Sequence, residues 1–252
     1  MSINNSNSQI SDKPLKVFVS GVFPSFSRYW KLFINLSDLS VLRILEYERL
    51  EKHNISGKIL DYGGGENSRY RSLINNRSND YIYESVNIDK SINPKYIIDE
   101  SGQIPVPDEQ YEYVLSLNTL EHIYDIYFAL KEIYRVLEPN GEIVFTVPFI
   151  FRAHGHPNDC FRGSACWWNK TLNQIGFDSI AIEALNWGAF TTATTISGMR
   201  GPFKRIRLHA NLIADILYAV CRYPNLKTYC ELQDSSICNA PLAYFITARK
   251  EG

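Results

Sequence analysis

Short apolar runs alternate with segments of helical character from residue 57 to the end of the chain. This alternation limits the fold more than any other feature. We expect strands at 57–63, 80–89, 95–99, 111–118, 141–148, 176–185 and 241–250. The segments expected to be helices are 67–76, 124–137, 164–175 and 203–220. Because strands joined through helices pair in parallel, the sequence predicts an α/β fold with a mostly parallel sheet.

The N-terminal part differs in composition from the rest of the chain. Residues 1–14 are rich in Ser and Asn, and we expect them to be disordered. Residues 15–54 contain a short extended segment (15–23) and leucines near helical spacing in 35–53, which predict an N-terminal helical cap. Residues 55–252 are the predicted main domain, with a helical insertion at about 200–232.

The overall composition excludes several classes of protein. The 252 residues are 45% hydrophobic, which is enough for a sizeable core, and they carry a net charge of −1. A chain without a strong positive field is not expected to bind nucleic acid. The five cysteines form no CxxC pair, and the start of the chain has no secretory signal, so we expect a reducing cytoplasm. No apolar run is long enough for a transmembrane helix.

A glycine turn ends the first predicted strand, in "ILDYGGGEN" at 59–67. Ligands of open parallel sheets bind beyond the carboxyl ends of the strands, and glycines let them approach the backbone closely. Gly63, Gly65 and Ser68 fit the GxGxxG spacing of dinucleotide sites only loosely. Asp61 would face the ligand and would suit the sulfonium and ammonium of S-adenosylmethionine better than the pyrophosphate of NAD. The alternative is an aspartate that only caps the turn.

The stretch resembles motif I of class I S-adenosylmethionine-dependent methyltransferases, apolar-apolar-D-x-G-x-G-x-G. Asp61, Gly63 and Gly65 match, whereas Asn67 stands where the family most often has a third glycine. We expect Asn67 to keep the turn because asparagine tolerates left-handed backbone. The resemblance implies a Rossmann-like seven-stranded sheet, mostly parallel, with the last strand antiparallel and helices on both faces.

Further blocks extend the resemblance over 55–185. "IPV", "YEYV", "LEH", "RVLEPNG" and "IVFTVP" follow one another between 97 and 148 in the family's order. Asp89, at the end of the second strand, is predicted to accept hydrogen bonds from the ribose. The resemblance implies that Asp99 or Glu100 lies beside the adenine and that Asn118 backs the methionine end. The predicted S-adenosylmethionine site therefore comprises Asp61, Tyr62, Gly63, Gly65, Asp89, Asp99, Glu100 and Asn118. We expect Glu121 and His122 to cap the next helix.

The loop after the fifth predicted strand, 148–168, holds the candidate catalytic residues, which are His154, His156, Asp159 and Arg162. Removal of a hydroxyl proton during methyl transfer suits histidine, so His154 or His156 is predicted to be the general base. Asp159 would orient the histidine, and Arg162 would hold the substrate. The alternatives are a loop that these residues merely order, and a metal site, which we do not expect.

The sequence thus predicts methyl transfer from S-adenosylmethionine to a small molecule. "HGHPNDCFR" resembles a stretch in methyltransferases of bacterial polysaccharide and secondary-metabolite pathways, which points to a hydroxyl of a sugar or secondary metabolite, with methylation of nitrogen or carbon left open. The alternatives are an inactive binding protein of the same fold and an NAD-linked oxidoreductase. The basic amphipathic segment 201–220 is expected to pack on the sheet or to form a homodimer contact, with contact to a membrane surface as the other alternative.

Overall fold

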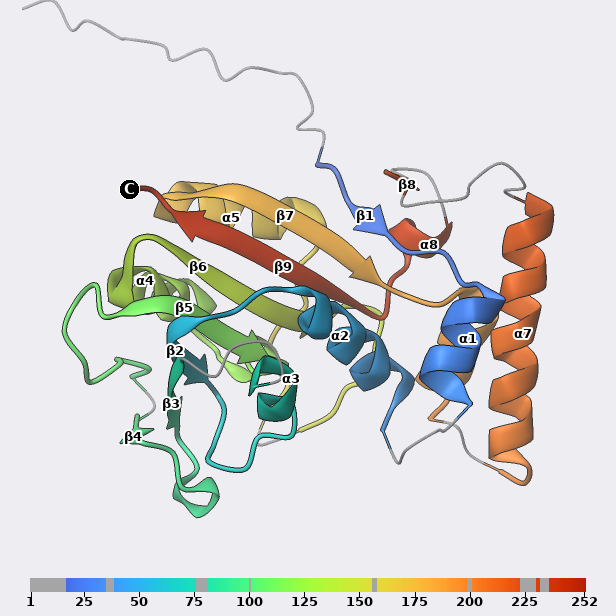
Figure 1. Ribbon diagram of the computed structural model, residues 1–252, viewed down its shortest axis with the longest axis horizontal. Coiled ribbons are helices and arrows are strands. Elements are labelled where there is room, and N and C mark those ends of the chain that lie inside the picture. Colours follow the sequence, from blue (N-terminus) through green and yellow to red (C-terminus); the bar gives the residue numbers. More distant parts are fainter. Residues whose placement is uncertain are drawn as a thin grey trace, which may run out of the picture.

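The computed structural model places helices on both faces of a single mixed β-sheet (Figure 1). It describes residues 17–34, 39–75, 81–99, 101–155, 158–198, 201–222, 230–231 and 236–252. The segment predicted to be disordered, 1–14, lies outside the described residues.

Within the described residues, the sheet has nine strands in the order β4-β3-β2-β5-β6-β9-β7-β1-β8. The strands are β1 (Ser20–Gly21), β2 (Gly57–Tyr62), β3 (Tyr81–Asn87), β4 (Tyr96–Ile97), β5 (Tyr111–Leu117), β6 (Leu137–Pro148), β7 (Phe177–Leu185), β8 (Cys230–Glu231) and β9 (Ala243–Lys250). All seven predicted strands are present. β9 is antiparallel to both neighbours, β6 and β7, which confirms the prediction for the last strand.

The predicted count of seven strands is too low by two. The two further strands, β1 and β8, lie beyond β7 at one edge of the sheet. β1 pairs in parallel with β7, and β8 pairs in antiparallel with β1. Each has two residues, too few to show a period-2 pattern in the sequence. Of residues 17–23, the described part of the extended segment expected at 15–23, only Ser20 and Gly21 join the sheet.

β6 begins at Leu137, four residues before the strand expected at 141–148. Residues 138–141 form an irregularity within this strand, whose register with β5 shifts between Tyr111 and Tyr113. Asn140 has φ 65° there, and a Cβ on Gly141 would lie 2.8 Å from the carbonyl oxygen of Glu138. Turn-forming residues thus lie within β6, and the strand continues to pair with β5 on both sides of them.

The helices form two layers, each over its own buried apolar cluster. Leu130, Ile133, Trp168 and Leu172 lie in one cluster; Phe33, Leu45, Trp187 and Leu212 lie in the other, so both faces are covered as predicted. The helices are α1 (Phe26–Phe33), α2 (Val41–Lys52), α3 (Arg71–Asn75), α4 (Ile126–Val136), α5 (Ala165–Ile175), α6 (Ala189–Ile196), α7 (Lys204–Arg222) and α8 (Ser236–Asn239). Short 3-10 helices, η1 (Lys90–Ile92) and η2 (Leu120–His122), follow β3 and β5.

α1 and α7 lie side by side at one end of the molecule (Figure 1). Leu208, Leu212 and Ile216 bury one side of α7, so this basic amphipathic helix is packed against the fold, one of the roles expected for it. Within the described part of the chain, none of the helices combines the length and apolar character needed to cross a bilayer.

The strand order changes direction next to β2. β3 and β4 follow on one side of β2, whereas β5 and β6 follow on the other. Chain connections leave a crevice at such a switch point, beyond the carboxyl ends of the strands. The turns after β2 and β5 therefore define where a ligand can bind.

Candidate active site

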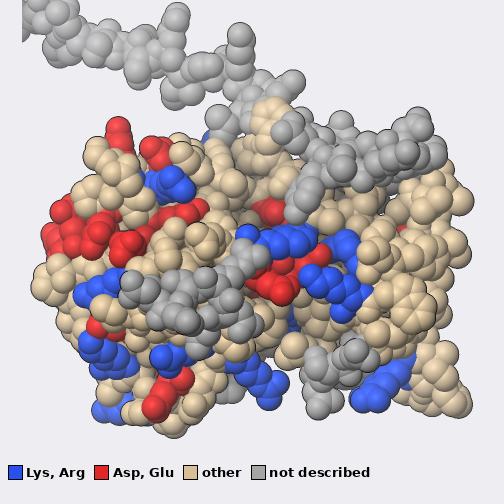
Figure 2. Space-filling view, in the orientation of Figure 1, with Lys and Arg blue, Asp and Glu red and all other residues tan. Residues whose placement is uncertain are grey.

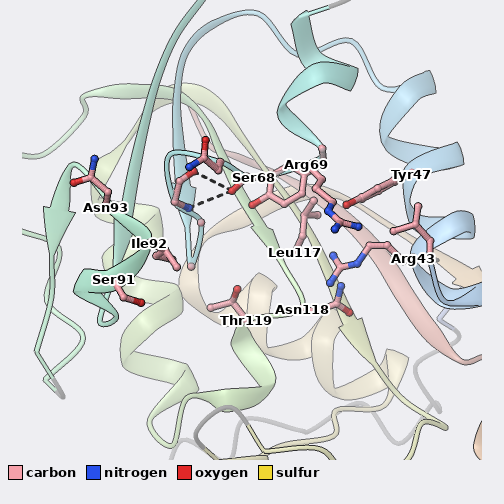
Figure 3. A pocket seen from close by; sticks show the side chains of 16 residues that line it. Arg43, Tyr47, Ser68, Arg69, Ser91, Ile92, Asn93, Leu117, Asn118 and Thr119 are labelled. Carbon is pink, nitrogen blue, oxygen red and sulfur yellow. Dashed lines mark hydrogen bonds between the residues drawn. The ribbon is translucent and has the colours of Figure 1, made fainter. Parts of the chain in front are cut away.

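A cavity of about 600 Å³ opens at this switch point, a volume typical of small-molecule sites. Figure 3 shows Arg43, Tyr47 and Arg69 along one side and Ser91, Ile92 and Asn93 along the other, with Asn118 and Thr119 between them. The residues that line it are Leu39, Arg43, Tyr47, Gly63, Gly64, Gly65, Asn67, Ser68, Arg69, Tyr70, Ser91, Ile92, Asn93, Leu117, Asn118 and Thr119. Gly63, Gly65 and Asn118 of the predicted cofactor site are among them.

The glycine turn leaves no room for side chains. Gly63 has φ 99°, and a Cβ there would lie 2.1 Å from the hydroxyl oxygen of Thr119. A Cβ on Gly64 would overlap the Asp61 carboxylate, and one on Gly65 would lie 2.6 Å from the carbonyl oxygen of Ile92. The turn is therefore clamped between β5 and the segment after β3, and its bare backbone forms one wall of the cavity.

Asp61 lies behind the turn and does not line the cavity, contrary to the prediction that it faces the ligand. Its carboxylate is completely buried and accepts hydrogen bonds from Tyr70 (2.5 Å), Tyr83 and Ser68 (3.4 Å). Burial raises the pKa of Asp61 to about 6, and these three donors hold it down. Asp61 thus shapes the turn from below, so its charge is no argument for a cationic ligand.

Asn67 keeps the turn for a different reason from the one predicted. It is not among the residues with positive φ, so this position needs no glycine-like freedom. Asn87 is a further turn residue that the sequence analysis missed. Its side-chain amide donates to the carbonyl oxygen of Gly63 at 2.6 Å, while the Gly63 amide donates to Val86 at 2.8 Å. The third glycine of the motif is thus dispensable for the backbone path observed here.

Two arginines that the sequence analysis also missed give the cavity a positive side. Arg43 comes from α2 and Arg69 from the segment before α3, and both reach the cavity (Figure 3). Arg43 is 3.1 Å from Glu46, whose other oxygen accepts from the Asn118 side chain at 2.7 Å. Burial raises the pKa of Glu46, and Arg43 opposes this. No Asp or Glu is among the described residues that line the cavity, so this side is suited to an anionic group.

The other residues predicted to bind the cofactor lie away from the cavity wall. The Tyr62 side chain is buried in the core with Ile104 and Leu130, so the prediction that it contacts the cofactor is wrong for its side chain. Asp89 caps η1 by accepting a hydrogen bond from the Ser91 amide at 2.8 Å. It lies two residues before Ser91, the first residue of this segment that lines the cavity. Asp99 accepts from the Ser101 amide in an exposed turn, and Glu100 lies outside the described residues.

The loop after β6 brings three of its four predicted residues together. Asp159 accepts a hydrogen bond from the backbone amide of His154 at 3.0 Å, and its role in orienting a catalytic histidine stays a prediction. Arg162 is paired with both oxygens of Asp159, so its guanidinium is engaged within the loop. Asp159 does not cap the next helix, because Ser164 does. His156 lies outside the described residues.

Glu121 and His122 lie next to His154. The prediction that they cap the next helix is wrong, because another residue caps it. Asp125 is the N-cap of α4 and accepts from the Phe128 amide at 3.0 Å. The Nε2 atoms of His122 and His154 lie 3.8 and 3.9 Å from Oε1 of Glu121. Burial raises the pKa of Glu121 to about 8. The turn after β5 and the loop after β6 thus bring a second group of titratable side chains together.

The central part of the chain matches a known family. Residues 61–145 match the model of the methyltransferase domain family, a range that runs from Asp61 to Phe145 and includes the glycine turn and η2. Over this range the chain is similar to methyltransferase domains, in agreement with the resemblance described from the sequence.

Curated relatives of the methyltransferase domain cover part of the chain. This chain is 28% identical over 107 residues to probable polyketide synthase 26 of Dictyostelium discoideum, across 42% of this chain and 4% of that protein. It is 30% identical over 82 residues to probable polyketide synthase 15 of the same organism, across 31% of this chain and 2% of that protein. The methyltransferase chain thus spans a very small part of these relatives.

Solved structures confirm the methyltransferase fold. A methyltransferase dependent on S-adenosylmethionine from Archaeoglobus fulgidus has a TM-score of 0.53 and 16% identity, with coverage of 90% of this chain and 100% of that one. The [4+2]-cyclase SpnF has a TM-score of 0.51 and 17% identity, with coverage of 83% and 80%. At these identities the likeness establishes the fold, and the fold is shared by a cyclase, so the reaction must be argued from the site.

Proposed function

We propose that the chain binds S-adenosylmethionine in the cavity at the glycine turn and transfers its methyl group to a small molecule. The observation that carries this proposal is the turn itself. Three glycines without space for a Cβ lie at the carboxyl end of β2, within the range that matches the methyltransferase family. A turn of this kind presents main-chain groups to a ligand at the switch point of the sheet.

The charges around the cavity suggest how the cofactor lies. Arg43 and Arg69 would bind the carboxylate of its methionine part, since guanidinium groups pair well with carboxylates. Ser91, Ile92 and Asn93 would lie along the adenosine, with Asp89 beside the ribose hydroxyls. Asn118, held by Glu46, would contact the methionine part from the end of β5. This placement keeps the predicted role of Asn118 and replaces Asp61 with the two arginines as the charged contacts.

The chemistry of methyl transfer asks mainly for alignment. When bound, S-adenosylmethionine supplies an activated methyl group on its sulfonium. The protein has to hold the acceptor in line with that methyl group and exclude water. An acceptor hydroxyl must also lose its proton, and Glu121, His122 and His154 are the side chains that we propose to assist this loss. Glu121 and His122 closely follow Thr119, which lines the cavity, and His154 lies beside them.

For the acceptor, we propose a hydroxyl of a sugar or secondary metabolite. Support comes from the named relatives, which are probable polyketide synthases and therefore makers of secondary metabolites. Cys160, Cys166 and Cys221 are exposed free thiols. A reducing cytoplasm stays a prediction. A homodimer contact through α7 stays a prediction.

A second candidate is a binding or cyclising protein that keeps the fold without transferring methyl groups. The similarity to a [4+2]-cyclase favours keeping this alternative. A turnover assay separates the two. The chain is incubated with isotopically methyl-labelled S-adenosylmethionine and a panel of polyketide and sugar hydroxyl compounds, and products are identified by mass. Transfer of the labelled methyl to one compound supports the proposal, whereas conversion of a compound without gain of the label supports the alternative.

A further inference from the structure

Glu121, His122 and His154 each aim one ligand atom at the same small volume. These atoms all lie within 4.8 Å of one another. The distances of 3.8 and 3.9 Å from Oε1 of Glu121 to the two Nε2 atoms are too long for hydrogen bonds. They suit two ligands that share one ion, because ligand atoms about 2.0–2.2 Å from a metal lie roughly 3–4 Å apart.

The Glu121 carboxylate is the strongest sign that something is bound here. Its side chain is fully buried, and neither oxygen has a hydrogen-bond partner among the described residues. The nearby guanidinium of Arg162 is already paired with Asp159. An unpaired buried carboxylate costs several kcal/mol, and natural folds rarely keep one without a proton, a cation or a metal to balance it.

Both histidines are held by their other nitrogen, as metal-binding histidines usually are. Nδ1 of His122 contacts the carbonyl oxygen of Asn158 at 2.5 Å, and Nδ1 of His154 contacts that of Arg152 at 3.3 Å. A carbonyl can only accept, so each Nδ1 donates and each Nε2 carries a free lone pair toward Glu121. Both rings are therefore fixed in the tautomer that binds a cation.

The backbone around the cluster is rigid. The carbonyl oxygen of Glu121 accepts from the amides of Cys160 and Phe161 at 2.8 and 3.1 Å, which ties η2 to the loop after β6. Asp159 in the same loop holds the His154 amide. Ligands on two separate segments are thus kept at a fixed spacing by bonds that do not involve the ligand atoms themselves.

We propose that Glu121, His122 and His154 bind one divalent transition-metal ion. Two imidazole nitrogens and one carboxylate favour zinc, manganese, iron or cobalt over magnesium and calcium, which prefer oxygen ligands. Three protein ligands leave coordination positions open for a substrate oxygen. In this proposal His154 is a ligand and not the general base that the sequence analysis predicts.

The consequence for the reaction rests on the proposed function. If the acceptor is a hydroxyl compound, its oxygen would fill an open position on the ion, and the charge of the ion would lower the pKa of that hydroxyl. The proton would then leave to water or buffer more easily, and the oxygen would be a better nucleophile for the methyl group. Metal binding by the three side chains does not depend on this step.

The experiment is a metal titration of the full chain after treatment with a chelator. Co²⁺ is added in the absence of S-adenosylmethionine and followed by its visible absorption, and Zn²⁺ is then used to displace it. We expect one ion per chain. Glu121→Gln, His122→Ala and His154→Ala should each weaken binding by more than the roughly 10–100-fold that even outer-shell changes cost. His154 lies on a partly exposed loop, so its variant tests the site even where Glu121→Gln does not fold.

The matched control is His53→Ala, because His53 is 3.5 Å from Glu142 and forms a histidine–carboxylate pair outside the cluster. This variant should bind the ion as the unchanged chain does. The proposal is overturned if the unchanged chain binds no ion, or if His154→Ala binds it as tightly as the unchanged chain. Binding of S-adenosylmethionine is measured separately on the same samples, so loss of the proposed function and loss of the metal site give different results.

Discussion

The cavity at the glycine turn and the cluster of Glu121, His122 and His154 are neighbours that differ in the groups they present to a ligand. The turn presents main chain, held in place by buried groups such as Asp61 and Asn87. The cluster presents side chains, brought together from the turn after β5 and the loop after β6. The first arrangement fits a cofactor common to many enzymes, whereas the second can vary with the substrate while the scaffold stays the same.

This contrast leads us to expect that the two regions can be damaged separately. A change in the cluster should affect chemistry and leave cofactor binding intact. A change in the turn should affect cofactor binding first. We do not expect surface charge to couple the two regions. On the face drawn in Figure 2, Lys and Arg are scattered in small groups among acidic residues.

The largest effect is expected from the cluster. Glu121→Gln and His154→Ala should lower turnover by about 10²–10⁴, the range usual for losing assistance to the removal of the acceptor proton. The affinity for S-adenosylhomocysteine, measured by calorimetry, should stay within about twofold, since neither residue lines the cavity. Equal losses of turnover and affinity would show that the two regions are one site.

The next largest effect is expected at the turn, where two glycines with positive φ allow a matched comparison. A Cβ on Gly63 would lie 2.1 Å from Thr119, whereas one on Gly102 would meet nothing closer than 3.8 Å. Gly63→Ala should therefore weaken cofactor binding by about 1–3 kcal/mol more than Gly102→Ala, or roughly 5- to 150-fold. Similar affinities for the two variants in calorimetry would mean that the turn does not form the binding wall.

A third prediction tests the support beneath the turn through pH. The pKa of Asp61 rises from 3.8 to about 6 on folding, so the unfolded chain releases this proton first as pH increases. Ionisation of Asp61 thus lowers stability between about pH 4 and pH 6, and Asp61→Asn removes that loss. The free energy of unfolding of the variant, relative to the unchanged chain, should increase by about 2–3 kcal/mol from about pH 4 to about pH 7.

Urea unfolding at several pH values measures this difference. The asparagine oxygen can still accept from Tyr70 and Tyr83, so the hydrogen bonds below the turn are largely kept. A difference that stays constant with pH would show that Asp61 titrates normally and does not hold the turn in the way described.

The last effect, similar in size to that at the turn, is expected at the rim of the cavity. If Asp89 holds the ribose as proposed, Asp89→Ala removes charge-assisted hydrogen bonds worth about 1.5–3 kcal/mol, so affinity for S-adenosylmethionine should fall at least about tenfold. Asp178→Ala, an exposed aspartate on β7, is the control and should leave affinity unchanged. An unchanged affinity in the Asp89 variant would remove that residue from the site.

The sequence was sufficient for those parts of the fold that local patterns specify. β2, β5 and β7 follow from apolar runs, and the turn follows from its glycines. α6 was not predicted because "AFTTATTI" is rich in threonine, a weak helix former. Its first amides are satisfied from a distance, by the Asp215 carboxylate on α7 at 3.0 and 2.8 Å. A cap supplied by another helix leaves no local signal.

The same limit explains which site residues were missed. Arg43 reaches the cavity from α2, and His154 meets Glu121 across more than thirty positions of sequence. The direction of the Asp61 side chain could not be predicted, because a residue two positions before a glycine can point either toward the ligand or beneath the turn. Tyr70 and Tyr83 decide this by donating to its carboxylate from below. Only the assembled fold brings these groups together.

The most direct test of the central proposal is a calorimetric titration of the unchanged chain with S-adenosylmethionine and, separately, with NAD. We predict one S-adenosylmethionine per chain, bound much more tightly than NAD, with the binding weakened in Gly63→Ala and kept in Glu121→Gln. Tighter binding of NAD, or no binding of S-adenosylmethionine at all, would contradict the assignment of the cavity at the glycine turn as its site.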